Sequence, residues 1–390
     1  MRSVLAAAWL LLACAWVVPA GALAQETEVT LAGVAYSGSK ETVDKRFAYS
    51  RKYQQQVEAG GDSPYKRVVA ALAQTPPRNL KVTTAPIEEL KGRDQALVVS
   101  LVLTSETVSV ENFGDARKLF ILLRGQALFF DFKSMTVVRA YPLSFAYIDN
   151  LRRDPTEADI LERVKLVYEG VAGKPGLFGR FAAALATATV PQQTPRFLQV
   201  TDVSLPPDML EQLPAYLRGE QSHKTWAADM VGEAISSRLG VPIVPYAKGY
   251  AIGGVMSLQV MQGDVYNLEL PKPDYAITVD FKGLKKVKFG QTGAGASFVY
   301  GAFADMRIQE TGDGPVFLNT ALKNAEVKVV PASQTHVDDF PAFNDSLNGM
   351  FVKLADAMAG KGNAWVKTAA GAADIEAQIS KTKDLMNLCK

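Results

Sequence analysis

The chain has 390 residues with 42 basic and 40 acidic side chains, which gives a formal net charge of +2. This near balance excludes the strongly basic composition of a nucleic-acid-binding protein. Hydrophobic residues make up 48% of the chain. That content excludes an intrinsically disordered protein and is enough for two domains with separate cores.

The first residues, 1–24, have the pattern of a cleavable signal peptide. Arg2 provides the positive charge, residues 3–18 are almost entirely apolar, and a small-x-small sequence ends at Ala24. We therefore expect cleavage after Ala24, a mature protein in the periplasm or secreted, and no transmembrane span after cleavage. The alternatives are an uncleaved anchor and lipid attachment at Cys14, because the four residues that end at Cys14 resemble a lipobox.

A first α+β unit is expected at residues 25–185. Ser63 and Pro64 begin one helix as its N-cap and N1 proline, and Thr156 with Asp159 predicts a capping box at the start of another. Between these helices, apolar runs predict three strands. The strands are predicted at residues 97–103, 119–132 and 136–143.

In the first two of these strands, residues 97–103 and 119–123 are apolar on both faces, unlike strands that leave one face to water. The second face is therefore either covered by another part of the chain or exposed as a binding surface. We expect intramolecular cover by the second half of the chain.

A linker is expected at residues 186–195, where small, polar and proline residues follow one another. A second α+β unit follows at residues 196–370, and a C-terminal helical tail at 371–390. The second unit begins with a helix around Trp226–Leu239 and ends with a helix whose methionine and aromatic stripe is typical of core packing. Its strands and second helix are predicted at residues 275–282, 297–309, 316–322 and 343–358.

The two units align with each other in several blocks that occur in the same order. Asp94–Leu101 matches Asp274–Phe281 in its pattern of apolar residues, and Val171–Lys174 matches Met358–Lys361. Internal similarity of this kind indicates duplication of a structural unit. The predicted fold class is therefore α+β, with two tandem copies of a unit in which helices cover an antiparallel sheet.

The order of a helix before antiparallel strands resembles the small α+β domains of envelope proteins. Examples are the N-terminal domain of the periplasmic Tol-system propeller protein and the curli secretion lipoprotein. Residues Trp226–Pro245 carry most of this resemblance. It implies a topology and no functional residues, because one fold hosts many functions.

The sequence has no assembled catalytic motif. It lacks a Gly-x-Ser-x-Gly elbow, a phosphate-binding loop and a dinucleotide-binding glycine pattern. We therefore expect no catalytic, cofactor-binding or metal-binding residues and no cofactor. His336 lies beside Asp338 and Asp339, but a metal site needs ligands from several elements. These residues are predicted to form a loop that leads into a helix.

After cleavage one cysteine remains, Cys389, so no intramolecular disulfide can form. The fold must therefore be stable through its core alone. We expect a free thiol on a frayed C-terminal tail, and an intermolecular disulfide is the alternative.

One candidate binding feature is a run of four lysines, Lys282, Lys285, Lys286 and Lys288, before a glycine-rich loop at 290–295. Such a run is either a solvated strand edge that resists aggregation or a patch for an anionic partner such as phospholipid, lipopolysaccharide or glycan. The expected partners are other envelope proteins or an anionic envelope component, and no nucleic acid. The sequence does not predict the oligomeric state.

Together these features predict an exported, non-enzymatic binding or scaffold protein of the bacterial cell envelope that supports envelope assembly, transport or surface structures. The alternatives are an envelope hydrolase with an unrecognised carboxylate site and a carrier of a small ligand in a cleft between the units. A deep pocket with converging carboxylates would favour the hydrolase, whereas an apolar cavity between the units would favour the carrier.

Overall fold

The computed structural model describes most of the chain that follows the expected signal peptide. The signal peptide itself, 1–24, with Cys14 and the cleavage site after Ala24, lies outside the described residues, as do residues 191–195 of the expected linker and His336. The described residues are 27–38, 40–90, 96–113, 115–190, 196–219, 221–261, 263–332, 334 and 337–390.

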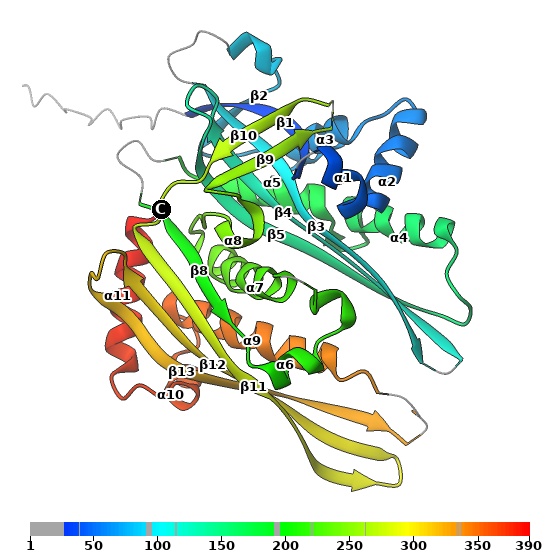
Figure 1. Ribbon diagram of the computed structural model, residues 1–390, viewed down its shortest axis with the longest axis vertical. Coiled ribbons are helices and arrows are strands. Elements are labelled where there is room, and N and C mark those ends of the chain that lie inside the picture. The colour runs from blue at the N-terminus through cyan, green and yellow to red at the C-terminus, as the bar shows by residue number, and fades with distance from the viewer. Residues whose placement is uncertain are drawn as a thin grey trace, which may run out of the picture.

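The described strands form two large sheets (Figure 1). The first sheet has the strand order β2-β1-β3-β4-β5-β10-β9, the second has the order β13-β12-β11-β8, and β6 and β7 form a short separate pair. The strands are β1 (Thr27–Ser37), β2 (Leu80–Thr83), β3 (Leu97–Phe113), β4 (Ala116–Asp131), β5 (Thr136–Leu151), β6 (Gly170–Val171), β7 (Lys174–Pro175), β8 (Leu198–Ser204), β9 (Val255–Val260), β10 (Val265–Glu269), β11 (Tyr275–Thr292), β12 (Gly295–Glu310) and β13 (Val316–Pro331).

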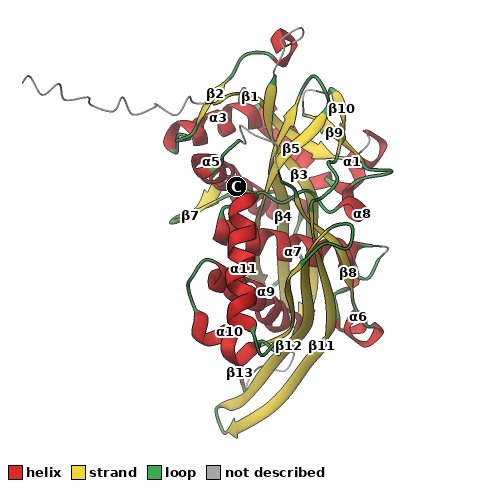
Figure 2. Ribbon diagram, turned by 90° about the vertical axis from the view of Figure 1, so that its left-hand side faces the viewer, coloured by secondary structure: helices red, strands yellow, loops and turns green. Residues whose placement is uncertain are grey.

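Helices lie against the sheets and between them (Figure 2), which confirms the predicted α+β class. Two predicted helix starts are present: Ser63 accepts a hydrogen bond from the backbone of Lys66, and Thr156 and Asp159 form a capping box. The helices are α1 (Lys40–Arg46), α2 (Ala48–Ala59), α3 (Pro64–Gln74), α4 (Glu157–Glu169), α5 (Leu177–Thr187), α6 (Pro207–Gln212), α7 (Ser222–Leu239), α8 (Ala247–Tyr250), α9 (Phe340–Met358), α10 (Asn363–Ala369) and α11 (Ile375–Leu388).

Helices α2 to α5 cover one face of the first sheet. Leu119, Ile121 and Leu123 of β4 are fully buried in the core that these helices form with the sheet. The rings of Tyr53 in α2 and Tyr168 in α4 stack with their centroids 4.3 Å apart. The helices therefore pack against one another as well as against the strands.

Strands β9 and β10 lie within residues 196–370, the expected second unit, but they belong to the first sheet. Strand β9 pairs with β1 through Ala35 and Val260, and a bridge between Glu269 and Thr136 joins β10 to β5. These pairings close a ring of strands around an apolar interior. The interior includes Val98, Val102, Phe130 and Leu258. The hairpin thus provides intramolecular cover for one end of the second face of the first sheet.

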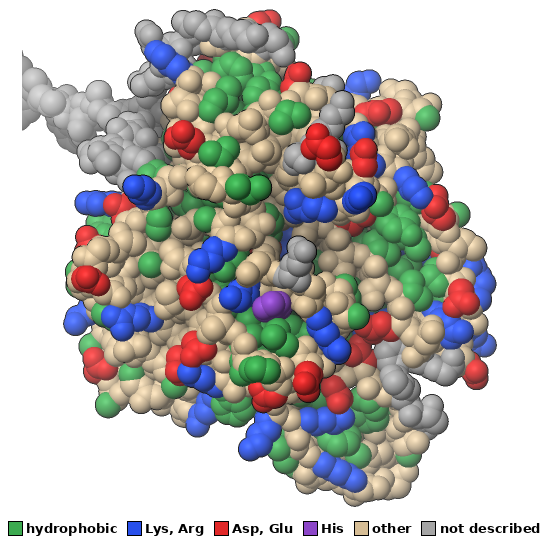
Figure 3. Space-filling model, viewed as in Figure 1, with side chains coloured by type: hydrophobic (Ala, Val, Ile, Leu, Met, Phe, Trp, Pro, Cys, Tyr) green, Lys and Arg blue, Asp and Glu red, His purple; other side chains and the backbone are tan. Residues whose placement is uncertain are grey.

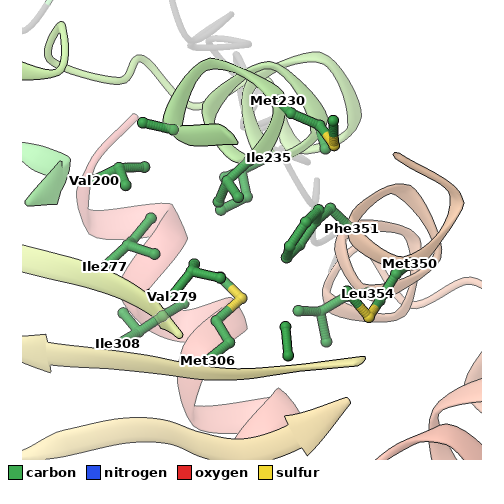
Figure 4. Packing of buried hydrophobic residues seen from close by; sticks show 14 of the residues in the cluster. Val200, Met230, Ile235, Ile277, Val279, Met306, Ile308, Met350, Phe351 and Leu354 are labelled. Carbon is green, nitrogen blue, oxygen red and sulfur yellow. The ribbon is translucent and has the colours of Figure 1, made fainter. Parts of the chain in front are cut away.

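The second sheet packs one face against helices α7 and α9 (Figure 4). Ile277 and Met306 point from neighbouring strands toward Ile235 of α7 and toward Phe351 and Leu354 of α9. The methionine and aromatic stripe of α9 is therefore core, as its spacing predicts. Helix α7 also contacts β5 of the first sheet. In the segment that follows α7, the backbone N–H of Ile243 donates a hydrogen bond to the carbonyl of Ala140 in β5.

The C-terminal helix is part of the second core. Ile379, Leu385 and Met386 of α11 are buried against the sheet and α9. Cys389 is only 1% exposed, and burial raises the pKa of its thiol to about 12. The expectation of a frayed tail is wrong, because apolar residues of the last two helical turns complete the core.

Four neighbouring strands of the first sheet, β1-β3-β4-β5, have the same order as the four strands of the second sheet, β8-β11-β12-β13. In each, an N-terminal strand runs parallel to the first of three consecutive antiparallel strands, β1 beside β3 and β8 beside β11. The three antiparallel strands have 17, 16 and 16 residues in the first sheet and 18, 16 and 16 in the second. Helices precede and follow these strands in both halves.

Candidate functional site

A cleft of about 1070 Å³ separates the first sheet from helices α7 and α9. One wall is the second face of strands β3, β4 and β5, and the opposite wall consists of α7 and the start of α9. Helix α7 lies between the two sheets (Figure 1). The cleft therefore contains side chains from both halves of the chain.

Apolar side chains line the sheet side of the cleft. Phe120 and Leu122 of β4 and Ile148 of β5 face it, and Ile148 is 52% exposed. The ring of Phe120 stacks on Tyr216, with centroids 6.1 Å apart. Strand β4 is thus apolar on both faces because one face is core and the other lines the cleft. At this end the second face is partly exposed and lines the cleft, whereas β9 and β10 of the second half cover it at the other end.

A polar cluster lies deeper in the cleft and joins four elements. Glu233 of α7 accepts hydrogen bonds from Ser144 of β5 at 2.7 Å and from Arg124 of β4 at 3.3 Å. One helical turn earlier, Asp229 accepts a hydrogen bond from the hydroxyl of Tyr250 at 2.5 Å. The two carboxylates share one face of α7, since residues four apart in a helix are neighbours.

Burial changes the acidity of this cluster. Withdrawal from water raises the pKa of Asp229 to about 6, the negative charge of Glu233 acts in the same direction, and Arg124 and the Tyr250 hydrogen bond oppose them. Burial also raises the pKa of Tyr250. Asp229 therefore changes its charge close to neutral pH, in a cleft that combines apolar and charged groups.

Two consecutive aspartates connect both sheets at one side of the cleft. Lys118 of β4 forms ion pairs with Asp338 and, at 2.8 Å, with Glu111. Asp339 accepts hydrogen bonds at 2.7 Å from Lys286 of β11 and from the hydroxyl of Tyr300 of β12. We call residues 338–339 the aspartate bridge, because Asp338 binds the first sheet and Asp339 the second.

The aspartate bridge lies where a loop into a helix is predicted. Asp338 also accepts a hydrogen bond from the backbone of Phe340 at 3.1 Å, which is the first residue of α9. Its carboxylate thus stabilises the start of the helix as well as the contact between the sheets.

The four lysines predicted as one patch do not lie together. Lys282 pairs with Asp280 and Asp305, Lys286 pairs with Asp339 and lies 4.5 Å from the ring centroid of Phe298, and Lys288 bonds to Gln291. Lys285 is exposed and has no ion pair among the described residues. Lys285 and Lys286 point to opposite faces because successive side chains of a strand alternate.

No group of three or more His, Cys, Asp or Glu side chains in the described ranges could hold a metal ion. Within the same ranges, none of the helices combines the length and the apolar character needed to cross a membrane. Figure 3 shows acidic and basic side chains interspersed over one side of the molecule, with hydrophobic ones between them.

Sequence reasoning did not identify the polar cluster. Its members, Arg124, Ser144, Asp229, Glu233 and Tyr250, span 126 positions of the sequence, from 124 to 250. Two signals were available: an arginine inside an otherwise apolar strand, and two acidic residues at i and i+4 in a largely buried helix. Either signal alone is also compatible with a solvated surface.

No protein-family model matches this sequence, and no curated protein matches it. Several solved structures have partial similarity, including the following two. A DUF330 protein from Xanthomonas campestris has 14% identity and a TM-score of 0.22, over 42% of this chain and 83% of its own. A minor lipoprotein from Acinetobacter baumannii has 10% identity and a TM-score of 0.21, over 43% of this chain and 90% of its own. Similarity at these TM-scores carries no inference about fold or function.

Proposed function

We propose that this chain is an exported, non-enzymatic binding protein of the bacterial cell envelope, and that its ligand occupies the cleft between the first sheet and helices α7 and α9. The observation that carries the proposal is a cleft of about 1070 Å³ with apolar side chains on one wall and a cluster of polar groups inside it. Ligand sites of proteins typically combine a largely apolar lining with a few placed polar groups.

We also propose that the two halves arose by duplication of one unit. The common strand order and the matched lengths of the three antiparallel strands support this origin. The β9–β10 hairpin is then an insertion in the second copy that came to cover the sheet of the first. A cleft between copies follows from this arrangement, because each sheet keeps one face for its own helices.

The cleft composition supports an amphipathic ligand. Phe120, Leu122 and Ile148 offer an apolar wall, on which rings or aliphatic chains lose contact with water. Arg124 and Ser144 lie beside this wall and orient polar groups of the ligand.

The proposal is tested with the fluorescent probe 1-anilinonaphthalene-8-sulfonate, which is an apolar ring system with one negative charge. Ala146 of β5 lines the cleft and is exposed, so Ala146→Trp fills the cleft without disturbing a core. We expect the mature protein to bind the probe at one site and the variant to bind it at least about tenfold more weakly. Fluorescence titration measures both.

The matched control is Ala377→Trp, at an exposed alanine of α11 that lines neither the cleft nor its walls. This variant should bind the probe as the unaltered protein does. Equal binding by all three proteins would show that the cleft is not the binding site.

An envelope hydrolase is the second candidate, and the raised pKa of Asp229, about 6, is the observation in its favour, because a group that titrates near neutral pH suits acid–base catalysis. Asp229→Asn separates the candidates. If the chain is a binding protein, extracts of envelope lipids and glycans incubated with the unaltered protein show no product by mass spectrometry. A product that is absent with the variant would identify a hydrolase.

A further inference from the structure

The three antiparallel strands of the second sheet continue beyond the helices as a projecting arm (Figures 1 and 2). We define this lysine arm as residues 283–303 of β11 and β12 with their turn, and residues 323–331 of β13. At its base the inner face packs on α9, where Tyr300 and Phe343 form an edge-to-face pair at 5.1 Å. The described helices leave most of the outer face uncovered, and only at its base does Ala369 of α10 line a hollow together with Phe303 and Lys323.

Strand register assigns the exposed apolar side chains to this outer face. Val287, Val299 and Val327 lie directly opposite one another on the three strands, so their side chains share one face. Tyr300 follows Val299 and therefore points the other way, toward α9. The three valines thus point away from the helices, into solvent.

Apolar exposure is concentrated on the lysine arm. Phe289 lies in the bulge between Lys288 and Gly290. A side-chain carbon added at Gly301 would lie 3.3 Å from the ring of Phe303, so this ring extends over the glycine and widens the apolar surface. The exposed fractions are 48% for Val287, 59% for Phe289, 37% for Phe303, 56% for Val327 and 68% for Val329.

Two lysines on the same face have no acidic partner among the described residues. Lys285 lies opposite Gly301, and Lys323 lies opposite Phe303. Glu326, the one acidic residue of the arm, lies opposite Tyr300 and hence on the inner face. The outer face therefore has basic and apolar side chains without acidic ones.

Two of the three lysines of the inner face differ in this respect, since Lys286 is paired with Asp339 and Lys328 with Asp345. The third, Lys288, bonds to Gln291. Most of the inner-face charge is thus neutralised, whereas both outer-face lysines lack an acidic partner among the described residues. Figure 3 shows basic and hydrophobic side chains close together on this lowest part of the molecule.

We propose that the outer face of the lysine arm docks on a lipid bilayer with anionic headgroups. Such a surface attracts lysines and accepts shallow insertion of apolar side chains. A second copy of the chain is disfavoured as the occupant, because a symmetric contact would place Lys285 and Lys323 against their own equivalents. The bilayer site lies outside the cleft and does not depend on the function proposed for it.

The test is co-sedimentation of the mature protein with vesicles of phosphatidylethanolamine that contain about one third phosphatidylglycerol, compared with vesicles that contain phosphatidylcholine instead. We expect binding to the anionic vesicles, little binding to the neutral ones, and release as salt rises to about 0.5 M. Lys285→Glu with Lys323→Glu should weaken binding at least about tenfold, and Val329→Ser should weaken it about fivefold.

Two matched variants alter other surfaces. Lys272→Glu makes the same charge change at an exposed lysine outside the arm, and Ile252→Ser removes an apolar side chain that is 90% exposed outside the arm. Both should bind as the unaltered protein does. Binding that ignores lipid charge and the arm lysines would overturn the proposal. A dimer in sedimentation velocity that Val329→Ser dissociates would assign the face to a second copy instead.

Discussion

Asp229 connects the chemistry of the cleft to the stability of the fold. Its pKa is raised from an ordinary 3.8 to about 6, chiefly because burial disfavours the charged form. Between these two values the folded protein binds the proton and the unfolded chain does not. The contribution of Asp229 to stability is therefore fully present below about pH 4 and is lost as the pH rises through 6.

Asp229→Asn should remove this dependence, because an amide has no proton to lose and its oxygen can still accept the hydrogen bond from Tyr250. We expect the variant to gain about 1–3 kcal/mol in the free energy of unfolding at pH 7 and little at pH 4. Urea unfolding at several pH values measures the difference. Asp384→Asn, at an exposed position of α11, should give no pH-dependent difference; a constant difference at Asp229 would contradict the assignment.

Helix α11 shows how an element at the end of the chain becomes part of a core. Its apolar stripe is sparse in sequence, yet Met386 is 1% exposed and Thr382 is fully buried. Thr382 donates a hydrogen bond to Gln378, one turn earlier in the helix. The helix contacts both β13 and α9, so the second core is incomplete without it.

Met386→Ala should therefore lower the free energy of unfolding by about 2–4 kcal/mol, because it leaves a cavity in a packed core. Lys383→Ala, at an exposed position of the same helix, should change it by less than about 0.5 kcal/mol. Thermal and denaturant unfolding compare the two. Equal small effects would mean that the helix is docked only loosely.

At the scale of the whole molecule, the aspartate bridge links two sheets that α7 also joins, through its contacts with β5 and β8. Lys118 and Asp338 are both largely withdrawn from solvent, at 13% and 19% exposure of their side chains. Burial raises the pKa of Glu111, and Asp338 beside it adds to the rise. The bridge therefore holds one side of the cleft through contacts that require the charged form of Asp338.

Asp338→Asn should loosen that side of the cleft. We expect faster hydrogen exchange in β4 and in the first turn of α9, with a loss of only about 1 kcal/mol in global stability, since Lys118 keeps Glu111 as a partner. Asp345→Asn is the control. Asp345 of α9 pairs with Lys328 of β13, so this ion pair lies within the second half and does not link the two sheets. Exchange that rises equally in both variants would argue against a specific role for the bridge.

Local patterns in the sequence were sufficient for the long antiparallel strands and for several of the helices. The alternation of Tyr275, Ile277 and Val279 predicts a half-buried strand, and these residues are buried in β11. Caps at Ser63 and Thr156 predict helix starts that are present. Such signals act over a few residues, so they do not depend on the rest of the chain.

These local patterns did not predict to which face of the sheet each lysine side chain of β11 points. A run of lysines predicts a basic patch, but alternation and two bulges, at 281–283 and 288–290, distribute the four side chains over both faces. Whether a lysine is neutralised then depends on aspartates elsewhere in the chain, such as Asp305 and Asp339. The surface that remains basic and apolar could be recognised only from the register.

The sequence by itself determined the α+β class, the long antiparallel strands with helices before and after them, and the apolar character of both faces of β4, because each follows from local spacing. Only the tertiary structure decided that β9 and β10 join the first sheet, and that Arg124 and Ser144 meet Asp229 and Glu233 in one cleft. The hydrogen bonds of Arg124 and Ser144 to Glu233 join residues about a hundred positions apart. Such contacts depend on how whole sheets and helices pack, which the local spacing of residues does not determine.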